Sequence, residues 1–276
     1  MNFNTGLASI HAYLCADGYV IKNPIYQKHK YYYIGLRNYN STILEDFKNK
    51  CKKQFGIIAR IKKDGRAVIQ NKSLYYKLTK NYSFYCREWK LPKLNQKNLK
   101  SWLRSFFDCE AWVEVQKGKS RVIGLDSANK EGLKAVHTAL KNFKISSSLS
   151  KTKKNLSRLT ICGKDDLTLF NKHIGFLHPI KSQKLYEALD SYVDYEWKIP
   201  YTKNELKRFI NRKGKLTKSK KQIRLFSIKK MNMINLKKKL KLFKINSKLH
   251  GPFKNQYGSV NYYLSLYYAN YKKLGR

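Results

Sequence analysis

The feature that most constrains the fold of this chain is an internal repeat of a strand, a helix and two further strands. The run Tyr33–Leu36 is echoed by Val122–Leu125, and an amphipathic helix pattern follows each run. Each helix pattern ends in a matched tripeptide, Phe55–Ile57 in one copy and Phe143–Ile145 in the other, at a spacing that agrees to within one residue. Matched order and spacing indicate that the chain is built from copies of one structural unit.

The elements inside the first two copies are regular enough to assign. In the first copy Asp64-Gly65 lies between strand patterns at 58–62 and 66–70 and predicts a hairpin turn. In the second copy the matching strands are predicted at 146–149 and 156–162. The apolar residues that predict one buried face of each helix are Ile43, Leu44, Phe47 and Cys51, and then Leu133, Val136, Leu140 and Phe143.

A third copy follows near the C-terminal end of the sequence. It opens with the strand Ile223–Leu225 and reaches the tripeptide Phe243–Ile245, with two more strands predicted at 247–250 and 259–264. The helix between them is predicted to bury Met231, Ile234, Leu236 and Leu240. Three copies in the same order make a repeated unit the favoured interpretation.

Each of the first two units is preceded by a helix pattern that ends at an acidic residue. These patterns cover residues 6–18 and 101–111, and the acidic residues are Asp17 and Glu110. Small side chains recur at every fourth position, which places them on one stripe and lets two helix backbones approach closely. We predict a helix interface that consists of Ala8, Ala12, Ala16, Ser101, Ser105 and Cys109.

Packing of the two stripes would place Asp17 and Glu110 side by side at one end of the helix pair. Two carboxylates held this close repel each other unless a cation lies between them. Mg²⁺ suits such a site, because it takes one or two carboxylates together with phosphate oxygens and water. On a basic surface the arrangement favours metal-assisted hydrolysis of a phosphodiester bond, with Asp17 and Glu110 as the catalytic residues.

The charge of the chain points to a polyanionic partner. Its 276 residues hold 59 Lys and Arg against 17 Asp and Glu, a net charge of +42. A field this strong repels itself unless it is neutralised, and phosphate contacts supply most of the affinity of basic proteins for nucleic acid. Codon bias in an AT-rich genome explains the preference for Lys over Arg, but it would also supply Asp and Glu, which are scarce.

Other locations and chemistries find less support in the sequence. We find no apolar run of the roughly 18 residues that a spanning helix needs and no signal-peptide pattern. We therefore expect no membrane partner and an intracellular, cytoplasmic location, or an organellar matrix if the gene is organellar. The five cysteines include no Cys-x-x-Cys pair and are expected to be reduced thiols.

Both helix patterns resemble a known nine-residue motif. Residues 10–18, Ile-His-Ala-Tyr-Leu-Cys-Ala-Asp-Gly, and residues 103–111, Leu-Arg-Ser-Phe-Phe-Asp-Cys-Glu-Ala, resemble LAGLIDADG. Two copies about 93 residues apart, each followed by the same unit, are similar to the LAGLIDADG homing endonucleases in their two-motif, single-chain form. The resemblance covers roughly residues 5–195, and it includes Phe170–Phe176 with Lys181.

This resemblance implies a fold and an activity. The fold is α+β, with duplicated αββαββα units whose antiparallel sheets form a saddle along the DNA major groove, and with a smaller α/β C-terminal extension. The activity is site-specific cutting of double-stranded DNA by a monomer that contains both halves and holds Mg²⁺ or Mn²⁺. The implied metal-binding set is Asp17 and Glu110 with their neighbours Ala16, Gly18 and Cys109.

The chain departs from the family pattern at two motif positions and throughout the third copy. Cys15 stands where the family commonly has Asp, and Ala111 stands where it has Gly; neither change need abolish cutting. Residues 206–214 align with the motif without a gap, but Lys213 takes the acidic position. Arginine and asparagine replace the small residues of the stripe, at Asn204, Arg208 and Arg212.

The third copy is therefore expected to have lost the metal-binding and interface roles, because a lysine cannot hold Mg²⁺ and arginines do not fit a close helix contact. We divide the chain into a first half at 1–92, a second half at 93–198, and a degenerate third repeat or basic DNA-binding extension at 199–276. The alternative is an unrelated basic domain that aids only solubility or folding.

Long polar side chains that alternate along the predicted strands can reach base edges in the major groove. Sequence does not separate contacts to bases from contacts to phosphates. The predicted DNA-binding residues are Lys28, Lys30, Arg60, Lys62, Arg66 and Gln70 in the first half and Lys117, Lys119, Arg121, Ser147 and Arg158 in the second. Candidates for a basic residue near the scissile phosphate are Lys22, Lys117 and Lys119.

Two interpretations without DNA cleavage stay open. The chain could be an RNA maturase that acts on its own intron RNA, or a non-cleaving DNA-binding protein of the same fold. Retention of an acid in both motifs, against its loss in the third copy, favours the nuclease. A ribosomal or RNA-chaperone protein fits the charge but not the duplicated acidic helices.

Overall fold

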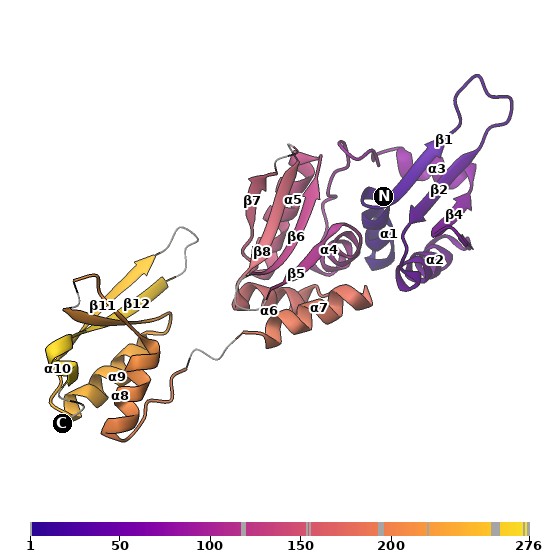
Figure 1. The fold of residues 1–276 in the computed structure, drawn as a ribbon. Coiled ribbons are helices and arrows are strands. Elements are labelled where there is room, and N and C mark those ends of the chain that lie inside the picture. The colour runs from indigo at the N-terminus through magenta and orange to yellow at the C-terminus, as the bar shows by residue number, and fades with distance from the viewer. Residues whose placement is uncertain are drawn as a thin grey trace. The chain divides into compact units, whose positions relative to one another are not determined.

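The computed structural model describes residues 2–116, 120–152, 154, 156–192, 196–219, 221–254, 260–272 and 274. The chain forms two compact units, Met1–Tyr192 and Val193–Arg276. Figure 1 shows the helices and strands of both units. Two hydrophobic cores lie in the first unit and a separate one in the second. Within the described ranges no helix is both long enough and apolar enough to cross a membrane.

The first unit begins with one complete repeat of helices and strands. Its four strands form an antiparallel sheet in the order β1-β2-β4-β3. In chain order the elements are α1 (Thr5–Cys15), β1 (Gly18–Lys22), β2 (Tyr32–Arg37), α2 (Ser41–Phe55), β3 (Arg60–Lys62), β4 (Arg66–Gln70) and α3 (Lys72–Thr79).

The second repeat completes the first unit and has the same topology. Its sheet has the order β5-β6-β8-β7 and is also antiparallel. The elements are α4 (Gln96–Glu110), β5 (Trp112–Val115), β6 (Arg121–Ser127), α5 (Lys130–Leu140), the 3₁₀ helix η1 (Lys141–Phe143), β7 (Ser148–Lys151), β8 (Ser157–Cys162), α6 (Lys164–His173) and α7 (Pro179–Asp190).

The second unit repeats this topology once more, with the sheet order β9-β10-β12-β11. Its elements are α8 (Lys203–Lys213), β9 (Gly214–Leu216), β10 (Gln222–Ser227), α9 (Lys230–Leu242), β11 (Ser247–Lys254), β12 (Val260–Tyr267) and α10 (Tyr268–Lys272). The predicted α+β fold of duplicated units with a repeat-like C-terminal extension is confirmed. The boundaries drawn at 92/93 and 198/199 stay predictions.

The matched tripeptides close the long helix of each repeat. The middle residue adopts a left-handed backbone conformation in all three, at Gly56 (φ +67°), Lys144 (φ +59°) and Lys244 (φ +57°). In the second and third repeats the next isoleucine donates its backbone N–H to the carbonyl five residues earlier, at 3.2 Å for Ile145 and 3.0 Å for Ile245. This pairing satisfies carbonyl groups at the helix end and turns the chain back to the core.

The predicted helix faces are buried in the first two repeats but shifted in the third. All four predicted residues of α2 are buried, as are all four predicted residues of the α5–η1 segment. In α9, Leu236 and Leu240 are buried as predicted, but Met231 is 58% exposed and Met233 takes its place. Apolar residues occur on several sides of this lysine-rich helix, so spacing alone did not fix the packed side.

Candidate active site

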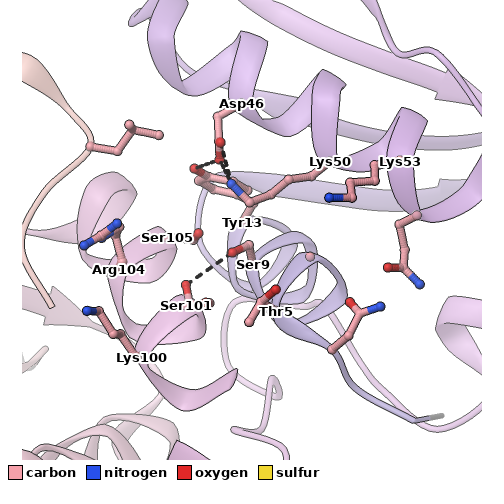
Figure 2. A pocket seen from close by; sticks show the side chains of 14 residues that line it. Thr5, Ser9, Tyr13, Asp46, Lys50, Lys53, Lys100, Ser101, Arg104 and Ser105 are labelled. Carbon is pink, nitrogen blue, oxygen red and sulfur yellow. Dashed lines mark hydrogen bonds and ion pairs between the residues drawn. The ribbon is translucent and has the colours of Figure 1, made fainter. Parts of the chain in front are cut away.

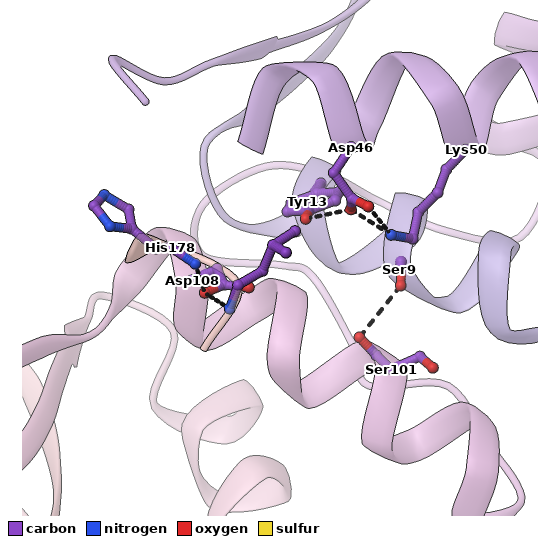
Figure 3. A network of polar contacts seen from close by, with 8 residues as sticks. Ser9, Tyr13, Asp46, Lys50, Ser101, Asp108 and His178 are labelled. Carbon is purple, nitrogen blue, oxygen red and sulfur yellow. Dashed lines mark hydrogen bonds and ion pairs between the residues drawn. The ribbon is translucent and has the colours of Figure 1, made fainter. Parts of the chain in front are cut away.

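The two motif helices pack against each other along their small residues. Ala8 and Ala12 of α1 are fully buried in the core that also holds Trp102 and Phe106 of α4. Across the same contact the Ser9 hydroxyl donates to the backbone carbonyl of Ser101 at 3.4 Å (Figure 3). Ser105 is buried, whereas Ala16 and Cys109 are half-buried at the end of the helix pair where the acids lie.

The structure places Asp17 and Glu110 near enough for the charge of one to affect the pKa of the other. Asp17 lies in the turn between α1 and β1, and Glu110 is the last residue of α4. Burial raises the pKa of Glu110 to about 7, and the negative charge of Asp17 contributes to the rise. A carboxyl group with this pKa is half-ionised near neutral pH, which is a state that a bound cation would shift strongly.

Gly18 serves the backbone turn that follows Asp17. A Cβ atom at this position would lie 2.3 Å from the Cα atom of Leu14, so only glycine fits. In the second motif the chain leaves α4 in an extended conformation at Ala111, which explains how alanine is accepted there.

Burial raises the pKa of the Cys109 thiol, and Asp17 raises it further, so the thiol stays protonated. Metal binding by Ala16, Gly18 and Cys109 stays a prediction.

Asp108 and Cys15 occupy equivalent motif positions but make different contacts. One carboxylate oxygen of Asp108 accepts the backbone N–H groups of Leu177 at 2.9 Å and His178 at 3.0 Å (Figure 3). It therefore anchors the segment between α6 and α7. Cys15 is buried beside His11, with its sulfur 3.4 Å from Nδ1.

Lys181 is a site residue that motif spacing did not identify. It lies on α7, and its Nζ donates to the carbonyl oxygens of Asp108 at 2.6 Å and Cys109 at 3.0 Å at the end of α4. A cation at the carbonyl end of a helix is stabilising. The charge of Lys181 also lowers the pKa of Glu110, against the larger effect of burial. In the sequence, Lys181 stood out only because the segment from Phe170 to Lys181 resembles the last part of the repeat in many family members.

Asn38 is a second residue that sequence reasoning missed. Its Nδ2 donates to the Asp17 carboxylate at 2.8 Å, and its Oδ1 accepts the backbone N–H of Asn40 at 2.9 Å. In the other repeats Ser127 and Ser227 occupy the equivalent position and make only the second of these contacts. The change from serine to asparagine between repeats was a usable signal, because only the amide is long enough to reach the acid.

A separate hollow of about 520 Å³ lies beside the first halves of α1 and α4 (Figure 2). Its polar centre is Asp46, which accepts a hydrogen bond of 2.7 Å from the Tyr13 hydroxyl and forms an ion pair with Lys50. Neither Asp17 nor Glu110 lines this hollow. It is therefore distinct from the acidic pair.

The open face of the first sheet carries four of the predicted DNA-binding residues. Arg66 and Gln70 alternate along β4 with the buried residues Ala67 and Ile69. Arg60 and Lys62 lie on the same face of the neighbouring strand β3, where both are exposed. The structure thus gathers Arg60, Lys62, Arg66 and Gln70 on one surface of the sheet.

Three other predicted contacts do not lie on strands. Lys28 and Lys30 were expected on a strand, but they lie in the loop between β1 and β2. Pro24 follows the end of β1 and cannot donate to a strand ladder, which explains the loop. Ser147 precedes β7 and hydrogen-bonds through its hydroxyl to His137 Nδ1 at 2.7 Å.

The predicted arginines of the second sheet contact groups of the protein itself. Arg158 makes two hydrogen bonds of 2.6 Å to Asp126, and its guanidinium lies over the Trp112 ring at 5.4 Å. Arg121 donates to the hydroxyl and the carbonyl of Ser191 at 2.5 and 2.7 Å. Lys117 and Lys119, which were also predicted to bind DNA, lie outside the described residues.

The donor set at the acidic pair is compatible with a divalent cation that keeps most of its water. In the described part of the chain no three His, Cys, Asp or Glu side chains gather as metal ligands. Mg²⁺ needs only one or two carboxylates, with the remaining positions taken by water and phosphate oxygens. The pair Asp17 and Glu110 fits that requirement.

Comparison of the sequence with known proteins finds one family and one curated relative. The family described as LAGLIDADG-like domain matches residues 97–175. The replication factor C small subunit of Thermococcus kodakarensis is 33% identical over 128 residues, which is 42% of this chain. The match covers only 14% of the length of that protein.

Solved structures that resemble parts of this chain include the homing endonuclease I-DmoI and the protein DUF199/WhiA. I-DmoI in complex with DNA and Ca is 15% identical, with a TM-score of 0.48 over 65% of this chain and 98% of that chain. Full-length DUF199/WhiA from Thermatoga maritima is also 15% identical, with a TM-score of 0.49 over 77% of this chain and 68% of that chain.

Proposed function

We propose that this chain is a LAGLIDADG family protein, on the match of residues 97–175 to the LAGLIDADG-like domain, and that it binds double-stranded DNA and cuts both strands at a specific, asymmetric site. Asp17 and Glu110 are the proposed catalytic acids. The observation that carries the proposal is that the negative charge of Asp17 raises the pKa of Glu110, two carboxyl groups that lie at the ends of equivalent helices of two repeats. A purely structural pair of this kind would be costly, because the charge of Asp17 opposes the ionisation of Glu110.

A divalent cation, Mg²⁺ or Mn²⁺, is the proposed cofactor. It would be held by the carboxylates of Asp17 and Glu110, and when bound it supplies stabilisation of charge on the phosphate. Asn38 orients Asp17 through its hydrogen bond of 2.8 Å. Lys181 holds the last carbonyl groups of α4 and so fixes the backbone next to Glu110.

The proposed DNA surface of the first repeat is the open sheet face that bears Arg60, Lys62, Arg66 and Gln70. Arginine and glutamine side chains can form paired hydrogen bonds to base edges in the major groove. Arg66 would have to exchange Asp64, and Arg158 of the second repeat would have to exchange Asp126, for a base or phosphate, so we assign less of the binding to these two arginines. The two surfaces differ, which supports an asymmetric target.

The test is cleavage of a randomised duplex library in Mg²⁺, with wild type compared to Asp17→Asn and Glu110→Gln. Glu45→Gln is the matched control, because Glu45 is an acid on α2 that forms a surface ion pair with Lys48 and no other ion pair among the described residues. We expect double-strand cuts by wild type and by the control, and nicking or no cutting by the two site variants. Binding of Mn²⁺, followed by its paramagnetic resonance, should weaken in the same two variants.

Each outcome separates the proposal from its alternatives. Cutting by Asp17→Asn at the wild-type rate would remove Asp17 from the site. Tight, salt-sensitive duplex binding without cutting, from a library shown to contain the target, would favour a non-cleaving DNA-binding protein. Tighter binding to intron RNA than to any duplex would favour a maturase.

A further inference from the structure

The open face of the C-terminal sheet differs in chemistry from the faces of the first two sheets at equivalent positions. Helices α8 and α9 pack on one side of the sheet through Leu225, Leu264 and Leu266 (Figure 1). The residues that alternate with these leucines point to the other side. Strand register aligns the following rows across the three sheets: Arg37–Arg66–Lys62, Asp126–Arg158–Ser150 and Phe226–Tyr263–His250.

The third row has become aromatic where the others are charged or polar. His250 stacks on Tyr263 with 4.4 Å between ring centroids and 14° between planes. Phe253 lies 5.5 Å from Tyr263 at 12°, and Phe226 lies 5.5 Å from it at 44°. Phe226 and Phe253 remain 47% and 45% exposed, so the rings keep free surface.

A row of cations lies next to the aromatic row. Register places Lys215, Arg224 and Lys248 across neighbouring strands, with Ser265 between the last two. In the first two sheets the position of Arg224 is a glycine covered by an aromatic ring of the first strand, Tyr19 over Gly35 and Trp112 over Gly124. The third sheet thus has an arginine, Arg224, at the position where the other two sheets have a glycine covered by an aromatic ring.

The guanidinium of Arg224 is only partly used within the protein. It lies over the Tyr263 ring at 5.1 Å, while its Nε is buried and has no hydrogen-bond partner among the described residues. Beside it a hollow of about 420 Å³ is lined by Lys248, His250 and Tyr267. Burial lowers the pKa of His250, and the charges of Lys248 and Arg224 lower it further, so its ring is neutral and suited to stacking.

We propose that this open face binds an unpaired strand of nucleic acid. Exposed rings offer stacking surfaces to bases, and the adjacent cations offer contacts to the phosphates that run beside them. Bases in a duplex already stack on one another and do not present their faces, so the aromatic row selects unpaired nucleotides. Stacking does not read the sugar, so RNA and DNA strands of the same bases bind alike. The role is separate from DNA cleavage and does not depend on Asp17 or Glu110.

Binding of labelled oligouridylate, oligodeoxyuridylate and a duplex to the full chain tests the proposal. Tyr263→Leu and Phe226→Leu should each weaken binding of both single strands about tenfold, because stacking contributes strongly per base, and should leave duplex binding unchanged. Tyr263→Phe keeps the ring and should bind like wild type. Tyr201→Leu is the matched control, because Tyr201 is 84% exposed in the same unit and its ring lies beside Lys239 of helix α9, at 4.8 Å.

Two further readouts separate stacking from general charge. Lys215→Gln and Lys248→Gln should reduce the slope of log affinity against log salt, whereas the ring variants should shift affinity without changing that slope. A strand that contains 5-iodouridine should crosslink to Tyr263 or its neighbours under light. Asp17→Asn should bind single strands as wild type does, so failure of the nuclease proposal leaves this result intact.

Several outcomes would overturn the proposal. One is unchanged single-strand binding in the Tyr263→Leu, Phe226→Leu double variant. Another is an equal loss of duplex binding in that variant, which would indicate a general basic surface. A tenfold preference for one sugar would contradict recognition by stacking. Because Phe226 is half-exposed, its substitution tests the surface even if Tyr263→Leu impairs folding.

Discussion

At the scale of single residues, Lys181 lowers the pKa of the motif residue Glu110, although the two are far apart in the sequence. Its charge opposes the rise in the pKa of Glu110, which lies at about 7. The substitution Lys181→Met should therefore raise the pKa of Glu110 further, because a nearby cation favours the ionised carboxylate. We expect Mn²⁺ affinity, which needs ionised Glu110, to require a higher pH in the variant, as measured by titration between pH 6 and 9.

The control for this prediction is Lys184→Met, three residues further along α7 and exposed. It removes the same charge without a contact to the end of α4. If both variants shift the pH midpoint equally, the effect comes from net charge and not from Lys181. Loss of the capping contacts should also lower the unfolding free energy of Lys181→Met by about 1 kcal/mol relative to the control.

His11 predicts an acid-sensitive contact between the motif helices. Its Nδ1 accepts a hydrogen bond of 3.1 Å from Trp102 Nε1, and burial lowers the pKa of His11 from 6.5 to about 3. Because the folded pKa lies below the unfolded value, this stability is present above pH 6.5 and is lost as pH falls toward 3. Between pH 7 and pH 5 the loss should be about 2 kcal/mol.

Urea unfolding of wild type and His11→Asn at both pH values measures this difference. The asparagine oxygen can still accept from Trp102, but the side chain does not titrate in this range. We expect the variant to be less stable overall because it is smaller, and to lose about 2 kcal/mol less between pH 7 and pH 5. An equal loss in both proteins would assign the acid sensitivity to other groups.

Single residues also mark where sequence reasoning ends. Asp17 and Glu110 could be identified because they occupy equivalent places in two repeats, and the comparison needed no contact information. Asn38 reaches the site from the segment after β2, and its signal in the sequence was the difference from the serines of the other repeats. Lys181 reaches the site from α7, and no local pattern encodes that contact. Lys213 occupies the position equivalent to Asp17 and Glu110. The same comparison of repeats therefore identified the loss of the acid in the third copy.

At the scale of elements, the repeat predicted the order of helices and strands because the hydrophobic pattern and the closing tripeptides are local. The edges of elements were less predictable. Strand β7 begins at Ser148, two residues later than expected, and Lys28 and Lys30 lie in a loop. These differences arise because tertiary pairing, and not local pattern, decides where a strand ends.

Gly124 and Trp112 make a testable element-scale contact. A Cβ atom on Gly124 would lie 2.3 Å from the Trp112 ring, which also contacts Arg158 and so is not free to move. Gly124→Ala should destabilise the protein by about 1 to 3 kcal/mol through overpacking between β5 and β6. In a Trp112→Leu background the same substitution should cost at least about 1 kcal/mol less.

Thermal or urea unfolding of the four proteins in this double-mutant cycle gives the coupling energy. Gly6→Ala is the control, because a Cβ there meets only ordinary contacts at 3.4 and 3.5 Å in the first turn of α1. It should be neutral or slightly stabilising. Additive costs for Gly124 and Trp112 would show that the ring is not what excludes the side chain.

At the scale of the whole molecule, charge is concentrated in the second unit. Residues 193–276 hold 23 Lys and Arg against 3 Asp and Glu, although they make up less than a third of the chain. This unit has its own core and has lost the acidic position of the motif. We therefore expect its charge to serve binding and not the proposed cleavage.

Ending the chain after Tyr192 tests this division of roles. The shortened protein keeps both cores of the first unit, so we expect it to fold and to cut the same DNA sequence. Its duplex affinity should fall, and the slope of log affinity against log salt should shrink by about 2 to 3, because each lost phosphate contact contributes roughly 0.9 to that slope. Fluorescence anisotropy across a range of salt concentrations measures both quantities. An unchanged slope would show that the second unit makes no phosphate contacts in the complex, and a changed target sequence would show that it reads bases.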